Sequence, residues 1–432
     1  MSAPPTIAVW SPRPPSPSGI ADYVAEQMPA LGAHLDVRWV GGENEAFTAD
    51  LDLYHLGNSP AHAFVYRAAR RRPGVVVLHD WSLHQLVLCE TVERGDVSAY
   101  LREMRRAHGE EGTFVGRQVA RALGGALLPA LYPVNDRILE GALAVVTLSR
   151  ALAERVARRL PGQPLLHLPH HLALPLHPLP SRAEARAALG LPADAAILTA
   201  PGLATSAKRL DSAIAALARL RARHPSLRLV IAGGVEPGLP LEAWAAAAGV
   251  ADRLVLTGRL DMADFVRHLC AADVVLALRF PSYGEMSGAL VRALGAGTPV
   301  LVTAGTPAAQ EFPEGVAIPV DPGPYEAAEL TAQVDHLLSR PEQAQALGRA
   351  ARAYTLEHHD LTRTAARLAA FLREVAPQAG AARETRARRE ALEGTRLGFY
   401  LDEIRPGARE LGLAVSGLAL EDVLAPLAGG AA

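Results

Sequence analysis

The stretch from Arg279 to Thr303, RFPSYGEMSGALVRALGAGTPVLVT, combines residues that are well suited to hold an anionic ligand. A glycine-bearing loop follows an apolar run, and Ser287 is placed to cap a short helix that stops at Gly297. A helix that begins at the carboxyl edge of a parallel sheet presents unpaired backbone N–H groups, which attract anions. Glu285, Ser287 and Arg292 lie at this predicted helix mouth. The alternative interpretation is an ordinary βαβ crossover with a tight loop and no ligand.

Polar residues and glycines also follow many of the other predicted strands. In open α/β sheets, ligands bind beyond the carboxyl ends of the strands. The residues at these ends are the Gly19 loop, Asn58, His79–Asp80, Ser149–Arg150, Thr205–Arg209, Gly233–Gly234 and Arg259. The sequence has no Walker loop, GxGxxG fingerprint, nucleophile elbow or HExxH motif. The only DxD, Asp50 to Asp52, precedes a predicted strand, so we expect no metal site there.

The elements that position these residues alternate between strand and helix. Apolar runs predict strands at residues 6–10, 35–40, 51–56, 75–78, 142–148 and 165–168, and again at 196–200, 227–232, 254–257, 274–278, 300–302 and 316–320. The segments between them have helical periodicity, residues 82–128 are expected to be mostly helical, and residues 341–375 read as two helices. This alternation predicts an α/β protein with two Rossmann-like, doubly wound parallel sheets.

The proline-rich segment PHHLALPLHPLP, residues 169–180, is the expected domain boundary. We expect domains at residues 1–175 and 176–355, a helix at 356–376, and a charged tail with a docking segment at 377–432. In that tail PQAGAARETRARREALEGTRLG is predicted to be a surface helix or a partly ordered tail, and not a nucleic-acid arm, because glutamates are interleaved with its arginines.

Composition excludes several classes of protein. A chain of 432 residues exceeds one ordinary core, and a net charge of -2 gives no strong field for nucleic acid or membrane. Cys89 and Cys270 are the only cysteines, which excludes a disulfide framework and a cysteine-based zinc site. No signal pattern and no apolar run of membrane-spanning length occur. We therefore expect a cytoplasmic protein, peripheral at most to the inner face of a membrane.

Several segments together resemble the retaining, nucleotide-sugar-dependent glycosyltransferases with the two-Rossmann GT-B fold, the glycogen synthase and mannosyltransferase superfamily called family four. The resemblance covers about residues 6–375 and is carried by PPSPSGIADY, VVVLHD, VVTLSRALAERV, HLPHHLAL, ILTAPGLATSAKRLDSAIAAL and LRLVIAGG. It implies two domains that face a cleft, with C-terminal helices that cross back to the first domain. The first domain would bind the acceptor and the second the nucleotide sugar.

The resemblance also implies roles for particular residues. Lys208, with Arg209 beside it, matches the basic position that neutralises the donor diphosphate, whose charge grows as the glycosidic bond breaks. His79, Glu285 and Lys208 are the implied catalytic residues. The implied donor-binding residues are Gly19, Lys208, Arg209, Gly284, Glu285, Met286, Ser287, Gly288, Ala289 and Arg292. Asp80 and Asn58 would bind the acceptor.

The reaction implied by the resemblance needs neither a metal nor another cofactor. The departing phosphate oxygen would accept the acceptor's proton in a front-face displacement. The expected partners are a nucleotide sugar as co-substrate and a glycan, lipid-linked or small-molecule acceptor, and no nucleic acid.

The sequence departs from the family's pattern at the helix mouth. Arg292 stands where the family has the second of two glutamates, which places Gly284 at the first position and displaces Glu285 by one. Leu203 replaces the family's arginine in the preceding loop. The alternatives are therefore an epimerase or a phosphorylase with this fold, and a catalytically inactive binding protein. For single residues, a structural His79, a solvated Lys208 and a salt-bridged Arg292 stay open.

Overall fold

The computed structural model describes residues 4–392, apart from residues 17 and 46, together with residue 404. The chain falls into two compact units. Unit 1 comprises residues 1–168, 283–286 and 362–432, and unit 2 comprises residues 169–282 and 287–361. Each unit contains one six-stranded sheet whose neighbouring strands run parallel. The predicted pair of doubly wound parallel sheets is confirmed.

The sheet of unit 1 has the strand order β2-β1-β3-β4-β5-β6. Its strands are β1 (Thr6–Trp10), β2 (Asp36–Val40), β3 (Leu51–Leu56), β4 (Val75–Leu78), β5 (Ala144–Thr147) and β6 (Leu165–His167). The chain winds from β1 outward to β2 and then returns to β3 on the other side of β1. The direction of winding therefore reverses between β1 and β3, and the loops that leave these two strands emerge side by side.

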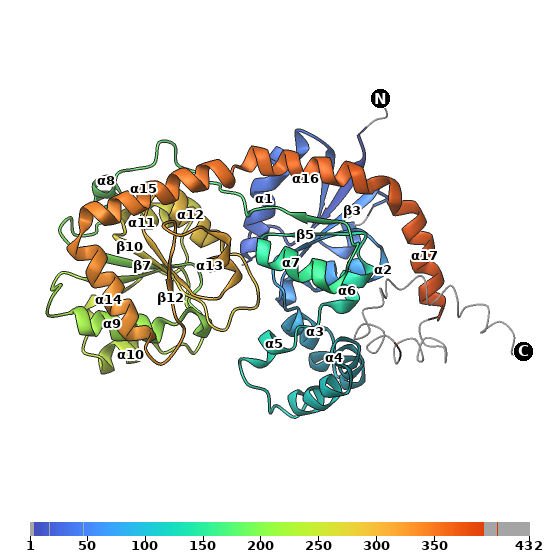
Figure 1. Ribbon diagram of the computed structural model, residues 1–432, viewed down its shortest axis with the longest axis horizontal. Coiled ribbons are helices and arrows are strands. Elements are labelled where there is room, and N and C mark those ends of the chain that lie inside the picture. Colours follow the sequence, from blue (N-terminus) through green and yellow to red (C-terminus); the bar gives the residue numbers. More distant parts are fainter. Residues whose placement is uncertain (1–3, 17, 46, 393–403, 405–432) are drawn as a thin grey trace, which may run out of the picture. The chain divides into compact units, whose positions relative to one another are not determined.

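Helices cover both faces of this sheet (Figure 1). One face carries α1 (Gly19–Gly32) and α16 (Leu361–Val375), and the other carries α2 (Ala63–Arg71) and α7 (Arg150–Arg159). A largely helical insertion joins β4 to β5 and contains α3 (His84–Glu90), α4 (Val97–Val119), α5 (Leu128–Leu131) and α6 (Asp136–Gly141). The remaining short helices of unit 1 are η1 (Glu43–Glu45), η2 (Pro60–His62), η3 (Val92–Arg94) and η6 (Ala376–Gln378).

The predicted helix over residues 82–128 is interrupted. Gly109 breaks the helical backbone inside α4, and the helix ends at Val119. Ala122 then has a φ of 59°, in the left-handed region, and Gly124 and Gly125 follow it. Residues with this conformation cannot continue a right-handed helix, so residues 120–127 form turns and extended backbone.

The C-terminal helices belong to unit 1, as the predicted fold class requires. In α16, Arg367 donates a hydrogen bond of 2.8 Å to the carbonyl of His167, and Arg373 donates one of 2.6 Å to the carbonyl of His34. In α17 (Ala379–Leu392), Arg383 pairs at 3.3 Å with Asp52, which also accepts from the indole of Trp10 at 2.9 Å. Asp52, the second aspartate of the DxD sequence, therefore anchors α17 to β3. The docking segment of residues 398–413 lies outside the described residues, apart from residue 404.

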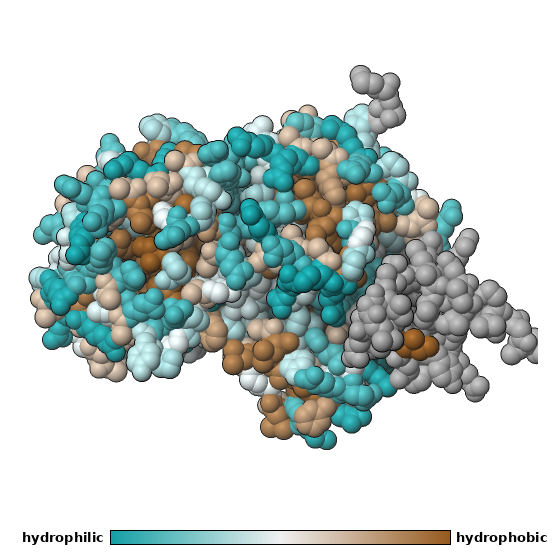
Figure 2. Space-filling view, in the orientation of Figure 1, coloured by the Kyte–Doolittle hydropathy of each residue, from teal (hydrophilic) through white to brown (hydrophobic). Residues whose placement is uncertain are grey.

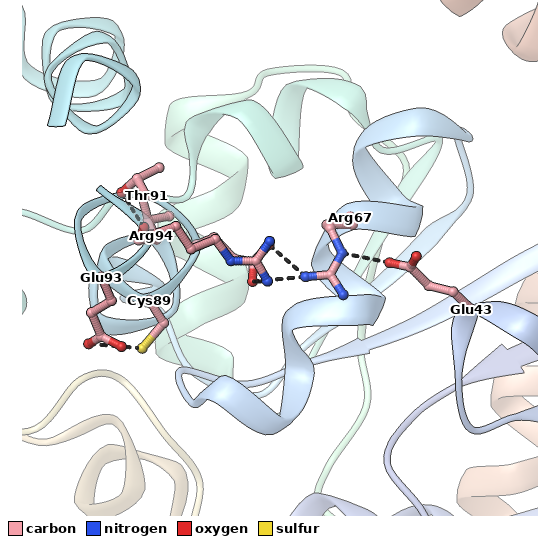
Figure 3. A network of polar contacts seen from close by, with 8 residues as sticks. Glu43, Arg67, Cys89, Thr91, Glu93 and Arg94 are labelled. Atoms are coloured by element: carbon pink, nitrogen blue, oxygen red, sulfur yellow. Dashed lines mark hydrogen bonds and ion pairs between the residues drawn. The ribbon is translucent and has the colours of Figure 1, made fainter. Parts of the chain in front are cut away.

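Ion pairs fasten the helical layer of unit 1 (Figure 3). Arg67 in α2 pairs at 2.6 Å with Glu43 and at 2.8 Å with Glu90 in α3, and Arg94 pairs with Glu90 at 2.8 Å. The hydrogen bond from Arg67 lowers the pKa of Glu43. The network tethers α3, which begins five residues after His79, to α2, the helix that precedes β4.

The sheet of unit 2 has the strand order β12-β11-β10-β7-β8-β9. Its strands are β7 (Ile197–Pro201), β8 (Arg228–Ala232), β9 (Leu254–Leu256), β10 (Val274–Ala277), β11 (Val300–Thr303) and β12 (Ile318–Val320). Here the winding reverses between β7 and β10. The loops that follow β7 and β10 are therefore the expected place for a ligand.

The core of unit 2 lies between its sheet and two groups of helices (Figure 1). One group contains α9 (Leu210–Leu220), α10 (Leu241–Ala247) and α14 (Glu326–Ser339), and the other contains α8 (Arg182–Ala188), α11 (Met262–Ala271), α12 (Gly288–Ala296) and α15 (Pro341–His358). The short helices are α13 (Pro307–Glu311), η4 (Ser206–Lys208) and η5 (Ala251–Arg253). No helix in the described part of the chain is both long and apolar enough to cross a bilayer.

Candidate active site

Lys208 lies in unit 2 at the point where the winding of the sheet reverses. Its loop follows β7, and the loop after β10 is tied to it by a 2.7 Å hydrogen bond from the N–H of Phe280 to the carbonyl of Ala207. The ammonium of Lys208 donates to the carbonyl of Pro201, the last residue of β7. A Cβ on Gly202, whose φ is +81°, would lie 3.1 Å from the Lys208 Nζ atom. The amine is thus held over the carboxyl edge of the sheet.

The surroundings of Lys208 lower the pKa of its amine to about 7. Burial is the larger cause and the nearby charge of Arg279 is the smaller one, since both disfavour a second positive charge. A bound dianion at this position would favour the protonated amine. A cation that is destabilised in the free protein and stabilised by an anion is typical of a ligand site.

Arg209 makes a different set of contacts from its neighbour. It has a φ of 55°, and its guanidinium pairs at 2.8 Å with Glu326 at the start of α14. The Glu326 carboxylate is buried and also accepts a 2.5 Å hydrogen bond from Ser212. This ion pair fixes Arg209, the residue next to Lys208, to the first turn of α14.

The predicted helix mouth is formed by α12. The Ser287 side chain accepts from the N–H of Leu290 at 3.3 Å, and Gly297 ends the helix with a φ of 83°. Both predicted helix signals are confirmed. The N–H groups of Gly288 and Ala289 therefore lie in the first turn, where backbone donors attract anions.

Arg292 is buried below this first turn, and its Nε atom donates to the carbonyl of Ala173 at 3.2 Å. A Cβ on Gly288 would lie 2.9 Å from Arg292 Nη1 and 3.1 Å from His170 Nε2. The absence of a side chain at residue 288 therefore makes room for two basic groups. Burial, followed by the charges of His171 and Arg292, holds the pKa of His170 well below its usual value. His170 is accordingly neutral, and Arg292 carries the charge.

Residues 283–286, between the β10 loop and α12, belong to unit 1. The N–H of Ser82 donates to the carbonyl of Tyr283 at 2.9 Å. Gly284 has a φ of +91°, and a Cβ there would lie 2.3 Å from the Cβ of Trp81. A glutamate at residue 284 would therefore clash with Trp81 and be held in a strained backbone conformation. The Glu285 carboxylate accepts from the N–H of Tyr283 at 2.7 Å, which fixes it within the loop.

His79 is half of a buried histidine pair at the carboxyl edge of the unit 1 sheet. Nε2 of His79 lies 3.0 Å from Nδ1 of His55, which is the fifth residue of β3. The ring of Tyr23 in α1 meets the His79 ring edge-on, with 5.0 Å between centroids. Because the two facing nitrogens share one proton, each imidazole fixes the tautomer and the ring orientation of the other.

Asp80 and Asn58 hold the loops of this edge together. The Asp80 carboxylate accepts from the N–H of Asn58 at 2.6 Å, and the Asn58 side chain accepts from the N–H of Leu86 in α3 at 3.1 Å. Gly19 opens α1, where Ser18 caps the helix and lies 3.4 Å from Nε2 of His62. The Gly19 loop, Asn58 and Asp80 are thus assembled around the place where β1 and β3 end.

The structure therefore brings the predicted residues together in two groups. Unit 1 holds Gly19, Asn58, His79, Asp80, Gly284, Glu285 and Met286, and unit 2 holds Lys208, Arg209, Ser287, Gly288, Ala289 and Arg292. Sequence reasoning missed His55, Arg279 and Trp81. His55 is hidden inside an apolar run, although its place near a strand end was a usable signal. In the described residues, no group of three or more His, Cys, Asp or Glu side chains is arranged to hold a metal ion.

Comparison with known proteins agrees with this architecture. Residues 181–354 match the family model described as "Glycosyl transferases group 1". Over 386 residues, 85% of this chain and 97% of the relative, the chain is 30% identical to the GDP-mannose-dependent alpha-(1-6)-phosphatidylinositol monomannoside mannosyltransferase of Mycolicibacterium smegmatis. It is also 32% identical, over 40% of its length and 41% of the relative, to a D-inositol 3-phosphate glycosyltransferase of Saccharomonospora viridis.

Solved structures share the fold at low identity. Sucrose-phosphate synthase from Thermosynechococcus elongatus has a TM-score of 0.58 at 18% identity, with 86% of this chain and 98% of that one covered. The lipopolysaccharide glycosyltransferase WaaG has a TM-score of 0.56 at 17% identity, covering 85% and 99%. Anabaena HepE in complex with UDP-glucose has a TM-score of 0.57 at 16% identity, covering 85% and 99%. The chain belongs to the group 1 glycosyltransferases and has their GT-B fold.

Proposed function

We propose that the protein transfers a hexosyl group from a nucleotide diphosphate sugar to an acceptor hydroxyl, with retention of the anomeric configuration and without a metal. The observation that carries this proposal is Lys208, whose amine lies at the reversal of winding in unit 2 with a pKa of about 7. A diphosphate bound there would receive the charge of Lys208 and the N-terminal dipole of α12.

These groups would stabilise the leaving group directly. As the bond between the sugar C1 and the diphosphate oxygen breaks, negative charge grows on that oxygen. Fixed cations and backbone N–H groups can balance this charge in the role that a divalent ion has in other transferases. Arg279, whose charge acts on Lys208, adds to the positive potential. We therefore assign the diphosphate to Lys208, Arg279 and the first turn of α12.

Retention would follow from a front-face displacement. The acceptor oxygen forms its bond to C1 on the face from which the diphosphate leaves, and the departing phosphate oxygen takes the acceptor's proton. The Glu285 carboxylate is held by the N–H of its own loop and would orient sugar hydroxyls. His79, oriented by His55, would bind near the reacting groups, with Asp80 beside it for the acceptor.

The nucleotide base of the sugar donor is to be identified by experiment. The mannosyltransferase relative is named for GDP-mannose, and HepE is described with UDP-glucose. A donor panel must therefore contain sugars of both bases. The acceptor is expected to be a glycan, a lipid-linked sugar or a small molecule, and the site of action to be cytoplasmic.

The test measures release of nucleoside diphosphate and transfer of labelled sugar by the wild type, Lys208→Ala and Lys208→Arg. We expect Lys208→Ala to lose at least about a hundredfold in rate, because it removes a charge from the leaving group, and Lys208→Arg to keep part of the activity. Circular dichroism shows that the variants fold. Full activity of Lys208→Ala would reject the assignment. Conversion without an acceptor would indicate an epimerase, and dependence on inorganic phosphate a phosphorylase.

A further inference from the structure

The insertion between β4 and β5 exposes apolar side chains over a short length of chain. Phe114 in α4, Leu123 in the following turn, and Leu127 and Leu131 at α5 are 63%, 68%, 48% and 68% exposed. The space-filling view shows hydrophobic residues gathered on the surface of the α4 and α5 region (Figure 2). Water-facing leucine and phenylalanine side chains at this density mark a surface that another apolar phase covers.

The charges of the same segment have one sign. Residues 112–131, GTFVGRQVARALGGALLPAL, contain Arg117 and Arg121 and no acidic residue. Both arginines are exposed. Glu111, which accepts from the hydroxyl of Tyr132, borders the segment, but the charges within the segment are basic. An apolar segment with basic side chains is complementary to the interface of an anionic bilayer, into which the apolar groups insert while the arginines meet lipid phosphates.

The segment is also joined to the loop that follows His79. The Ser82 hydroxyl donates to the carbonyl of Pro129 at 2.6 Å, and the side chain of Asn135 donates to the carbonyl of Trp81 at 2.6 Å. Nδ1 of His84 lies 2.6 Å from the carbonyl of Tyr132. The exposed apolar surface is therefore hydrogen-bonded to the segment that begins two residues after His79.

We propose that residues 112–131 are a docking surface for an anionic lipid bilayer, and that they deliver an acceptor carried on a lipid to the loop of His79. The second half of this statement rests on the proposed function, whereas the first half concerns binding alone. The proposal selects a lipid-linked acceptor from the classes that the sequence leaves open.

The experiment sediments the full chain with vesicles of phosphatidylcholine, with and without phosphatidylglycerol. We expect binding to the mixed vesicles and little binding to pure phosphatidylcholine. The double variant Leu127→Gln and Leu131→Gln should lower the partition coefficient about tenfold or more, because two leucines no longer insert. Arg117→Gln and Arg121→Gln should each lower it about fivefold. Leu356→Gln is the matched control, since Leu356 in α15 is also 48% exposed, and should bind as the wild type does.

Three results would overturn the docking surface: no binding of the wild type to anionic vesicles, equal binding of the leucine double variant, or equal loss in the Leu356→Gln control. If the chain forms a concentration-dependent dimer that the leucine substitutions abolish, the surface binds a second copy of the chain and not a bilayer. Donor hydrolysis should stay within about twofold of the wild type in the leucine variants, since these side chains face solvent. Loss of binding with unchanged hydrolysis therefore tests the docking separately from the proposed reaction.

Discussion

The lowered pKa of Lys208 makes the affinity for a diphosphate donor depend on pH. In the free protein the amine has a pKa of about 7, because it is buried and lies near the charge of Arg279. A bound diphosphate favours the ammonium form and raises this pKa. Below the free pKa the amine is already charged, so donor affinity is independent of its titration. Above that pH the amine is mostly neutral, so binding of each donor is accompanied by uptake of one proton from solution.

The size of the effect follows from the same value. The protonated fraction of a group with a pKa of about 7 falls about tenfold for each pH unit above it. Between about pH 7 and about pH 9, the dissociation constant should therefore rise roughly fiftyfold. Calorimetric titration with a nucleotide diphosphate sugar, in buffers of different ionisation enthalpy, measures both the constant and the proton uptake. Uptake should approach one proton per donor at the alkaline end.

The matched control is Lys208→Arg. A guanidinium stays charged throughout this range, so the variant should bind donor with a dissociation constant that changes less than about threefold. Titration of the nucleotide base affects both proteins alike and cancels in the comparison. A flat profile for the wild type, or the same slope in the arginine variant, would refute the reasoning.

Three further predictions concern single contacts. Gly284→Ala should destabilise the fold by about 3 kcal/mol or more in denaturant titration, because the new Cβ would meet the Cβ and the backbone of Trp81 and residue 284 has a left-handed conformation. Gly315→Ala has the same kind of φ and open space, and should cost only about 1 kcal/mol. Glu326→Ala should cost about 3 kcal/mol, because it removes the buried carboxylate that pairs with the partly buried Arg209 and accepts from Ser212, whereas Asp211→Ala removes only an exposed partner of the same arginine and should stay within about 0.5 kcal/mol. His55→Phe keeps the packing but removes the bond to His79, the histidine that we propose lies near the reacting groups. It should lower kcat at least about tenfold and alter its pH profile with donor KM unchanged, and an unaltered pH profile would show a packing role only.

The fold was accessible from the sequence because local signals and topology agree. Apolar runs such as Thr6–Trp10 are parallel strands, and the cap at Ser287 and the stop at Gly297 mark the real ends of α12. Once strands and helices alternate, few arrangements of the sheets satisfy the handedness of the crossovers. The predicted positions beyond the strand ends followed from the same rule, and Lys208 is where that rule puts it.

The candidate site was harder to predict from the sequence, because its details depend on contacts between segments that are distant in the chain. Arg209 pairs with Glu326, 117 residues away, and no local sequence pattern predicts that pairing. The need for glycine at residue 284 comes from Trp81, about two hundred residues earlier in the chain, so an alignment shows a missing glutamate without its cause. His55 escaped notice because a buried histidine inside LDLYHL resembles an ordinary core position.

The most direct test of the central claim is the melting temperature of the purified chain with UDP-, GDP- and ADP-sugars. A donor at a hundred times its dissociation constant stabilises the folded state by about 2.7 kcal/mol, which corresponds to a shift of several degrees. We predict such a shift with at least one donor for the wild type and a much smaller one for Lys208→Ala. No shift with any nucleotide sugar at saturating concentration would contradict a donor site at Lys208 and the glycosyl transfer built on it.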